Sequence, residues 1–221
     1  MLSQFAADYL QNTGWNKSIK LKACVGSKGN PIPWYTYPAI RMLNKLVKPE
    51  YDVFEYGAGN SSKWYSKKVK SLISVEHNSE WHKKVNLKTT ILVPENSKRN
   101  EKHYGKIEPF YKLVQDKDLD RHDRTVPFMS YACEILNYDK KFDIVVVDGA
   151  ARVLATWLAI QKVKDGGFIV FDNSDRATRY KKCFEWLKGF GFARIDFWGP
   201  GPLNPYEWCT SIFTKNIEIF K

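Results

Sequence analysis

The sequence lacks the features that mark membrane-spanning, secreted or disulfide-stabilised chains. No apolar run approaches the ~18 residues that a membrane-spanning helix needs. The first residues, MLSQFAADYLQ, carry no basic segment before an apolar run, and they favour an amphipathic helix over a secretion signal. The four cysteines form no CxxC pair. These absences predict reduced thiols, no membrane span and a cytoplasmic location.

Acidic residues are in the minority. The chain has 24 Asp and Glu against 35 Lys and Arg, which gives a formal charge of +11. Such a charge suits an anionic partner such as nucleic acid, or it reflects a soluble protein whose lysines are solvated. None of the four histidines has the spacing of a zinc motif such as HExxH. With 221 residues and 43% hydrophobic content, the chain is long enough for one core, so we expect a single domain over residues 1–221.

Short apolar segments alternate along the chain with helical ones. The expected strands are 51–56, 71–76, 89–93, 142–148 and 166–172, and 193–199 and 209–215 are expected to form a closing pair. The expected helices are 37–47, 60–69, 78–85, 129–137, 152–163 and 177–190. This alternation predicts an α/β fold with a Rossmann-like, doubly wound sheet. Residues 1–48 are expected to form a helical cap, and the polar segment 94–127 a lid loop over the acceptor.

The segment FEYGAGNSS, residues 54–62, places two glycines at the end of the first expected strand. Glycines let the backbone approach a ligand closely, and a helix follows. A dinucleotide fingerprint requires a third glycine where Ser62 stands, and Glu55 would repel a pyrophosphate. S-adenosylmethionine carries an ammonium group and no phosphate, so the pattern favours this cofactor. Glu76 ends the second strand, 17 residues after Gly59, where it can accept hydrogen bonds from ribose hydroxyls.

The segments FEYGAGNSS, SVEHN, VVVDGA and GFIVFDNSD together resemble class I S-adenosylmethionine-dependent methyltransferases, from about Tyr37 onward. The resemblance implies a seven-stranded, mostly parallel sheet whose last strand is antiparallel. It assigns cofactor binding to Glu55, Gly57, Gly59, Asn60, Ser61, Ser62, Glu76, His77 and Asp148.

Acidic residues also end the fourth and fifth expected strands, at Asp148 and at the pair Asp172–Asn173. Ligands of open α/β sheets bind at this edge. The pattern resembles cation-dependent small-molecule O-methyltransferases, which implies Mg²⁺ or Mn²⁺ held by Asp148, Asp172 and Asn173. Alternatively, Asp172 and Asn173 cap the next helix and Asp148 shapes the cofactor pocket. The chain departs from many such relatives at Ala151, where they carry a lysine, and Arg152 follows.

Two aromatic stretches, 31–40 and 199–213, resemble segments of bacterial and large-virus methyltransferases that belong to glycan-synthesis gene sets. Aromatic faces suit sugars, and core packing is the alternative. The predicted substrate residues are Trp34, Tyr35, Tyr37, Tyr206 and Trp208.

The sequence therefore predicts a metal-assisted O-methyltransferase that acts on a hydroxyl of a sugar, a glycan or a similar small molecule, in the host cytoplasm if the protein is viral. The alternatives are an RNA or other nucleic-acid methyltransferase and a binding module without activity. Asp148, Asp172 and Asp175 are the predicted catalytic residues, and the choice of proton acceptor stays open between Asp175, Glu207 and Asp148.

Overall fold

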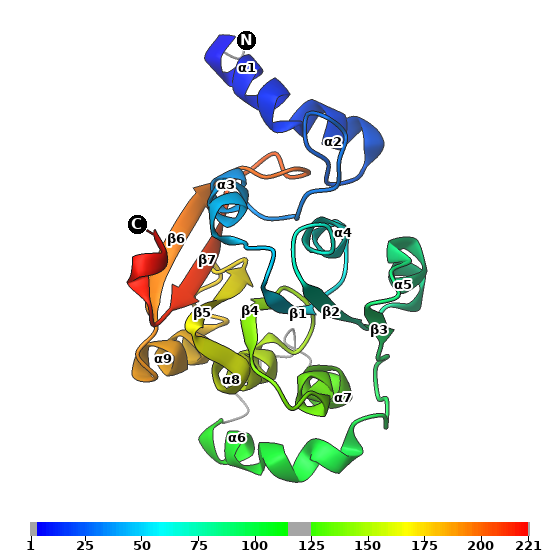
Figure 1. Ribbon diagram of the computed structural model, residues 1–221, viewed down its shortest axis with the longest axis vertical. Helices are drawn as coiled ribbons and strands as arrows, with labels where there is room; N and C mark the ends of the chain where they lie inside the picture. Colours follow the sequence, from blue (N-terminus) through cyan, green and yellow to red (C-terminus); the bar gives the residue numbers. More distant parts are fainter. Residues whose placement is uncertain (1–3, 115–124, 221) are drawn as a thin grey trace.

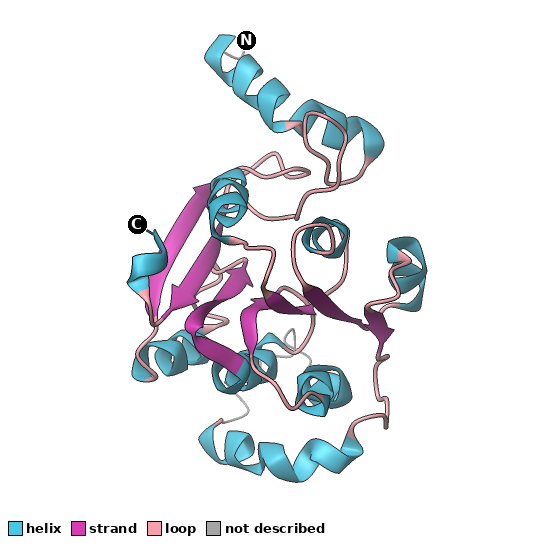
Figure 2. Cartoon of the chain, viewed as in Figure 1, coloured by secondary structure: helices cyan, strands magenta, loops and turns pink. Residues whose placement is uncertain are grey.

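A seven-stranded sheet runs through the computed structural model, which describes residues 4–114 and 125–220 (Figures 1 and 2). Its strands are β1 (Asp52–Tyr56), β2 (Ser71–Glu76), β3 (Thr90–Leu92), β4 (Phe142–Val147), β5 (Val163–Asp172), β6 (Ala193–Gly199) and β7 (Trp208–Thr214). They lie in the order β3-β2-β1-β4-β5-β7-β6. Strands β1 to β5 pair in parallel, whereas β7 is antiparallel to both of its neighbours. The predicted fold class is confirmed.

Helices cover both faces of the sheet because its central strands are apolar on both sides. In β4, Ile144 and Val146 pack on one face, while Val145 and Val147 pack on the other. The first face is covered by α3 (Tyr37–Leu46) and α4 (Asn60–Tyr65), and the second by α7 (Met129–Ala132), α8 (Arg152–Lys162) and α9 (Lys181–Gly189), as Figure 1 shows. The parallel strands therefore all end at one edge of a covered sheet.

The remaining elements lie around this frame. They are α1 (Gln4–Thr13), α2 (Trp15–Leu21), α5 (Ser79–Val85), α6 (Glu108–Leu113) and the 3-10 helices η1 (Glu101–Ile107), η3 (Val126–Phe128), η4 (Cys133–Asn137) and η5 (Ile217–Phe220). Helices α1 and α2 extend away from the sheet at the top of Figure 1. Over residues 4–114 and 125–220, no helix has the length and apolar character to cross a membrane. All four cysteines are buried thiols.

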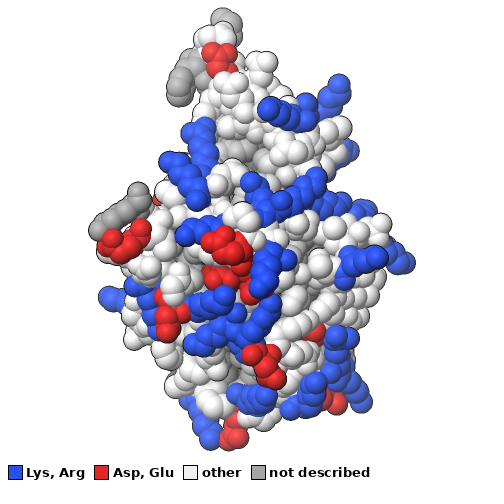
Figure 3. Space-filling model, viewed as in Figure 1, with Lys and Arg blue, Asp and Glu red and all other residues white. Residues whose placement is uncertain are grey.

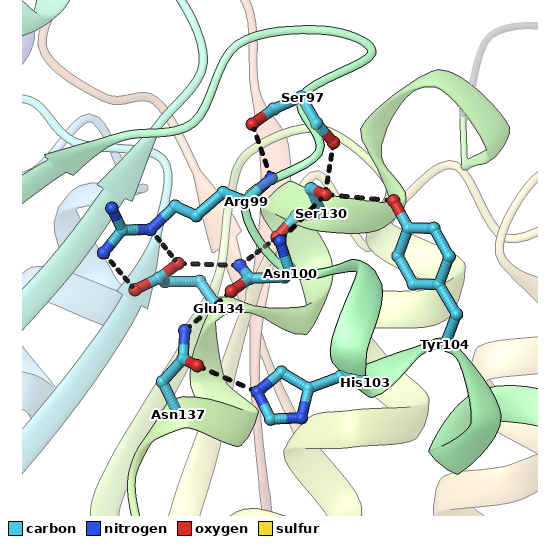
Figure 4. Close-up of polar contacts among 8 residues, drawn as sticks. All are labelled: Ser97, Arg99, Asn100, His103, Tyr104, Ser130, Glu134 and Asn137. Atoms are coloured by element: carbon cyan, nitrogen blue, oxygen red, sulfur yellow. Dashed lines mark hydrogen bonds and ion pairs between the residues drawn. The ribbon is translucent and has the colours of Figure 1, made fainter.

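Much of the segment expected to be a lid loop is helical and anchored. Phe110 of α6 is fully buried, and its ring lies 5.9 Å from that of Trp186 on α9. Arg99 and Asn100 lie just before η1 and anchor it to η4. The buried Glu134 carboxylate accepts hydrogen bonds from Arg99 Nε at 2.9 Å and Asn100 Nδ2 at 2.7 Å, within the polar cluster of Figure 4. Residues 115–124 of the expected lid lie outside the described residues, so the lid stays a prediction.

Candidate active site

A cavity of about 870 Å³ lies at the carboxyl ends of the parallel strands. It brings together most of the predicted site residues. Those that line it are Trp34, Gly57, Gly59, Asn60, Ser61, Glu76, His77, Asp148, Asp172, Asn173, Asp175, Tyr206 and Trp208. The predicted residues that do not line it are Tyr35, Tyr37, Glu55, Ser62 and Glu207. A cavity of this size is in the range of small-molecule sites.

Gly57 lies where the turn after β1 packs against the turn after β4. Its φ of 91° is in the left-handed region, and an added Cβ would lie 3.0 Å from the backbone of Asp148 and Gly149. Any side chain would therefore be strained and would separate the two turns. Gly59 differs, because its φ of −175° is extended and its Cβ position lies 3.7 Å from the nearest atom, Trp81 Nε1. Glycine at position 59 leaves the cavity wall open.

The glycine turn was expected to let the backbone approach a ligand closely, but its N–H groups already have protein partners. Gly57 N–H donates to Val75 O at 2.9 Å, Ala58 N–H to Glu76 Oε2 at 3.0 Å, and Gly59 N–H to Ser62 Oγ at 2.9 Å. The turn is thereby fixed by its own protein contacts. The turn would therefore contribute space to a ligand site, because Gly57 and Gly59 have no side chains that would fill the cavity.

Glu55 lies beneath this turn and is fully buried. Its Oε2 accepts hydrogen bonds from Ser62 Oγ at 2.5 Å and Ser74 Oγ at 2.6 Å. Burial raises the pKa of the Glu55 carboxyl to about 7, and the surrounding serine hydroxyls limit the rise. We expected Glu55 to contact the cofactor ammonium, but the structure places it off the cavity wall. There it holds Ser62, which in turn holds the Gly59 N–H.

Glu76 does reach the cavity wall. Its Oε1 accepts from His77 N at 2.9 Å and Asn78 N at 2.8 Å, and its Oε2 accepts from Ala58 N at 3.0 Å. A carboxylate oxygen has two acceptor positions, so Oε2 retains one. These contacts pre-orient the carboxylate toward the cavity, where it can accept a hydrogen bond from a ligand hydroxyl.

Asp148 and Asp172 end neighbouring strands and both line the cavity. Burial, followed by the nearby Asp172, raises the pKa of Asp148 well above its usual range, and Arg152 opposes the rise. Burial likewise raises the pKa of Asp172, against the effects of Arg152, Thr210 and Trp208. Each carboxylate is therefore a stronger proton acceptor than an exposed one.

The predicted metal site is not supported by the contacts of these residues. Asp148 Oδ1 is paired with Arg152 Nη2 at 3.0 Å, and Asp172 Oδ1 accepts from Trp208 Nε1 at 3.0 Å and from Thr210 Oγ1. Within the described part of the chain, no three His, Cys, Asp or Glu residues are grouped as ligands for a metal ion. A guanidinium and two protein donors already occupy the Oδ1 atoms of Asp148 and Asp172, and a cation at these atoms would have to displace them.

The predicted substrate aromatics divide into two groups. Trp34 and Tyr206 line the cavity and are 44% and 61% exposed, and Trp208 lines it while nearly buried. Tyr35 and Tyr37 are instead buried and pack in the core on the α3 face. For these two residues, core packing is the role that the structure shows.

Sequence reasoning missed several residues of the wall, among them Lys22, Cys24, Trp81 and Arg176. Trp81 Nε1 donates to Ala58 O at 2.5 Å, so its indole ring lies at the glycine turn. Asn60 Nδ2 donates to Cys24 O at 2.8 Å and joins α4 to the N-terminal segment. Of these residues, only Trp81 could have been found from the local sequence, because it lies in the helix that follows Glu76. The contact of the N-terminal segment with α4 joins residues that are far apart in the sequence.

Solved structures that are similar to this chain include proteins whose names are those of methyltransferases. The precorrin-6y C5,15-methyltransferase of Geobacter metallireducens aligns at a TM-score of 0.50 and 14% identity, over 90% of this chain and 96% of that one. This chain shares its fold with that enzyme. A methyltransferase of Pyrococcus furiosus aligns at a TM-score of 0.49 and 15% identity, over 98% of this chain and 100% of that one. An rRNA methylase of Streptococcus thermophilus aligns at 0.47 and 10% identity, over 81% and 97%.

No profile of a known protein family matches the chain, and no curated protein sequence matches it either. The similarity is therefore one of fold alone, and only the cavity bears on the identity of the acceptor.

Proposed function

We propose that this protein is an S-adenosylmethionine-dependent O-methyltransferase that acts on a hydroxyl of a sugar, a glycan or a similar small molecule. One observation carries the proposal: a single cavity joins the glycine turn and Glu76 to two strand-end carboxylates and an aromatic rim. Glu76 offers an acceptor for ribose hydroxyls, and Gly57 and Gly59 leave space beside it. These residues fit the cofactor.

The reaction needs a positioned hydroxyl and a place for its proton. S-adenosylmethionine, when bound, supplies a methyl group on a positively charged sulfur and leaves as a neutral thioether. The new bond joins the acceptor oxygen to the methyl carbon, and the hydroxyl proton passes to the carboxylate of Asp148 or Asp172. Trp34 and Tyr206 present exposed ring faces on which a sugar ring can stack. Holding the acceptor in this way lowers the entropic part of the barrier.

The basic charge keeps a nucleic-acid acceptor as the second candidate. In Figure 3, Lys and Arg side chains spread over much of the visible face, with acidic side chains in smaller groups between them. Lys22, Lys84 and Arg176 also line the cavity. A nucleic-acid acceptor predicts binding that weakens steeply with salt.

The test is transfer of a labelled methyl group to a panel of free glycosides and to RNA. We expect transfer to a glycoside, and Asp172→Asn should reduce turnover strongly while calorimetry shows unchanged affinity for S-adenosylhomocysteine. Asp165→Asn is the matched control, because Asp165 is an exposed acid at the other end of the same strand. Transfer to RNA but to no glycoside would replace the proposal with the second candidate. If neither the methyl donor nor its product binds, both are wrong.

A further inference from the structure

Arg152 occupies the space between the ends of β4 and β5. The side chain is 11% exposed and donates to three backbone carbonyls: Gly149 O from Nε at 3.1 Å, Asp148 O from Nη2 at 3.1 Å, and Asp172 O from Nη1. The same Nη2 lies 3.0 Å from Asp148 Oδ1. A guanidinium has five N–H donors in a fixed plane, so these contacts fix its position and orientation.

Aromatic rings support the guanidinium from β5 and from the residue that precedes α9. Its Cζ lies 5.7 Å from the centre of the Tyr180 ring and 5.9 Å from that of Phe171. Cation–π contacts of this kind favour a positive charge where water is excluded. Ala151, which precedes it, has a φ of 50° and ends the turn after β4, so α8 begins at Arg152 itself. The fold thus delivers one fixed positive charge to the edge where Asp148 and Asp172 converge.

We infer that Arg152 is an internal cation that takes the place of a divalent metal at this site, and that methyl transfer here is independent of added metal. Two carboxylates at one cavity repel each other unless a positive charge lies between them. Arg152 supplies that charge as part of the chain, so the charge cannot dissociate from the site. It also holds Oδ1 of Asp148, whose side chain remains 21% exposed. Arg152 is in this sense a positioning residue: it orients the Asp148 carboxylate and contacts neither acceptor nor cofactor.

The inference rests on the proposed function, but its first test does not require activity. Mn²⁺ binding to the wild-type protein, with and without S-adenosylhomocysteine, can be followed by electron paramagnetic resonance. We expect no stoichiometric site below millimolar Mn²⁺, and methyl transfer unchanged by exhaustive chelation. A tight Mn²⁺ site that Asp148→Asn abolishes would overturn the inference, even if the acceptor has not been found.

The second test is chemical rescue of Arg152→Ala. We expect kcat to fall at least 100-fold with the affinity for S-adenosylhomocysteine within threefold of wild type, and guanidinium at tens of millimolar to restore at least a tenth of kcat. Mg²⁺ at the same concentration should restore nothing. Arg194→Ala is the control, because Arg194 forms its pair with Asp196 on β6, outside the cavity. A folded Arg152→Ala protein with unchanged kcat, or one rescued by Mg²⁺ but not by guanidinium, would overturn the inference. If Arg152→Ala does not fold, Arg152→Lys and the Mn²⁺ measurement decide the question.

Discussion

Glu55 should make the stability of the ligand-free protein depend on pH, and Glu55→Gln should remove that dependence. Burial raises the pKa of the carboxyl from 4.5 to about 7. Between these two values the folded state binds more protons than the unfolded state. The free energy of unfolding therefore falls as pH rises through this window, and the protein gives up stability that it has at lower pH.

The size of the effect follows from these two pKa values, 4.5 and about 7. At about 1.36 kcal/mol per pH unit, complete titration corresponds to about 3 kcal/mol, most of which falls between pH 5 and pH 8. A glutamine at this position carries no charge at either pH. The difference in unfolding free energy between Glu55→Gln and wild type should thus shift in favour of Glu55→Gln by about 2–3 kcal/mol from pH 5 to pH 8.

Urea unfolding of both proteins at pH 5, 6, 7 and 8, followed by tryptophan fluorescence, measures this difference directly. All other titrating groups are common to both proteins, so they cancel in the comparison. Glu50→Gln, an exposed glutamate just before β1, is the control and should show no such trend. A constant difference between Glu55→Gln and wild type across the four pH values would show that Glu55 is ionised in the folded protein and would refute the reasoning.

Three further outcomes are expected. Glu76→Gln should weaken binding of S-adenosylhomocysteine by about 10-fold or more in calorimetry, because a charge-assisted hydrogen bond contributes about 1.5–3 kcal/mol; unchanged affinity would remove Glu76 from the site. Tyr206→Ala should raise the acceptor KM without changing the melting temperature, whereas Tyr37→Ala should lower stability by about 3–5 kcal/mol; the reverse pattern would contradict the division of the aromatics. Glu134→Gln should destabilise the protein in urea by about 1–3 kcal/mol, since buried Asn100 loses a charged partner; equal midpoints would argue against the cluster of Figure 4.

The fold was predictable from the sequence because its signal is local and repeated. Apolar strands such as 142–147 alternate with amphipathic helices, and each pair of strands with its crossover helix admits essentially one handedness. The place of Gly57 and Glu76 on the cavity wall was predictable for a related reason. Gly57 and Glu76 lie at strand ends, and parallel strands end at the same edge of the sheet.

What the sequence did not reveal depends on contacts between distant segments. Asp148 and Asp172 were correctly expected at one edge, but the pattern cannot show that Arg152 reaches across to the carbonyl of Asp172. Glu55 was assigned to the ligand site, but its carboxylate accepts a hydrogen bond from Ser74 of the next strand. The local pattern around Glu55 does not reveal this contact. Trp34 and Tyr35 are adjacent in the sequence, yet one is exposed at the cavity and the other is buried. Residue type alone did not distinguish these cases.

Part of the cavity wall is made by two segments that lie outside the sheet's strands. One is 22–34, near the start of the chain, and the other is 203–206, before β7. They are joined through Asn204, whose side-chain oxygen accepts from Trp34 Nε1 and whose carbonyl accepts from Trp15 Nε1, both at 3.2 Å. Substitutions in these segments can reshape one half of the cavity while the strand ends that form the other half keep their packing. Such a division of the chain allows one scaffold to acquire new acceptors by exchanging its peripheral loops, and it marks 203–206 as the first segment to vary in a directed-evolution library.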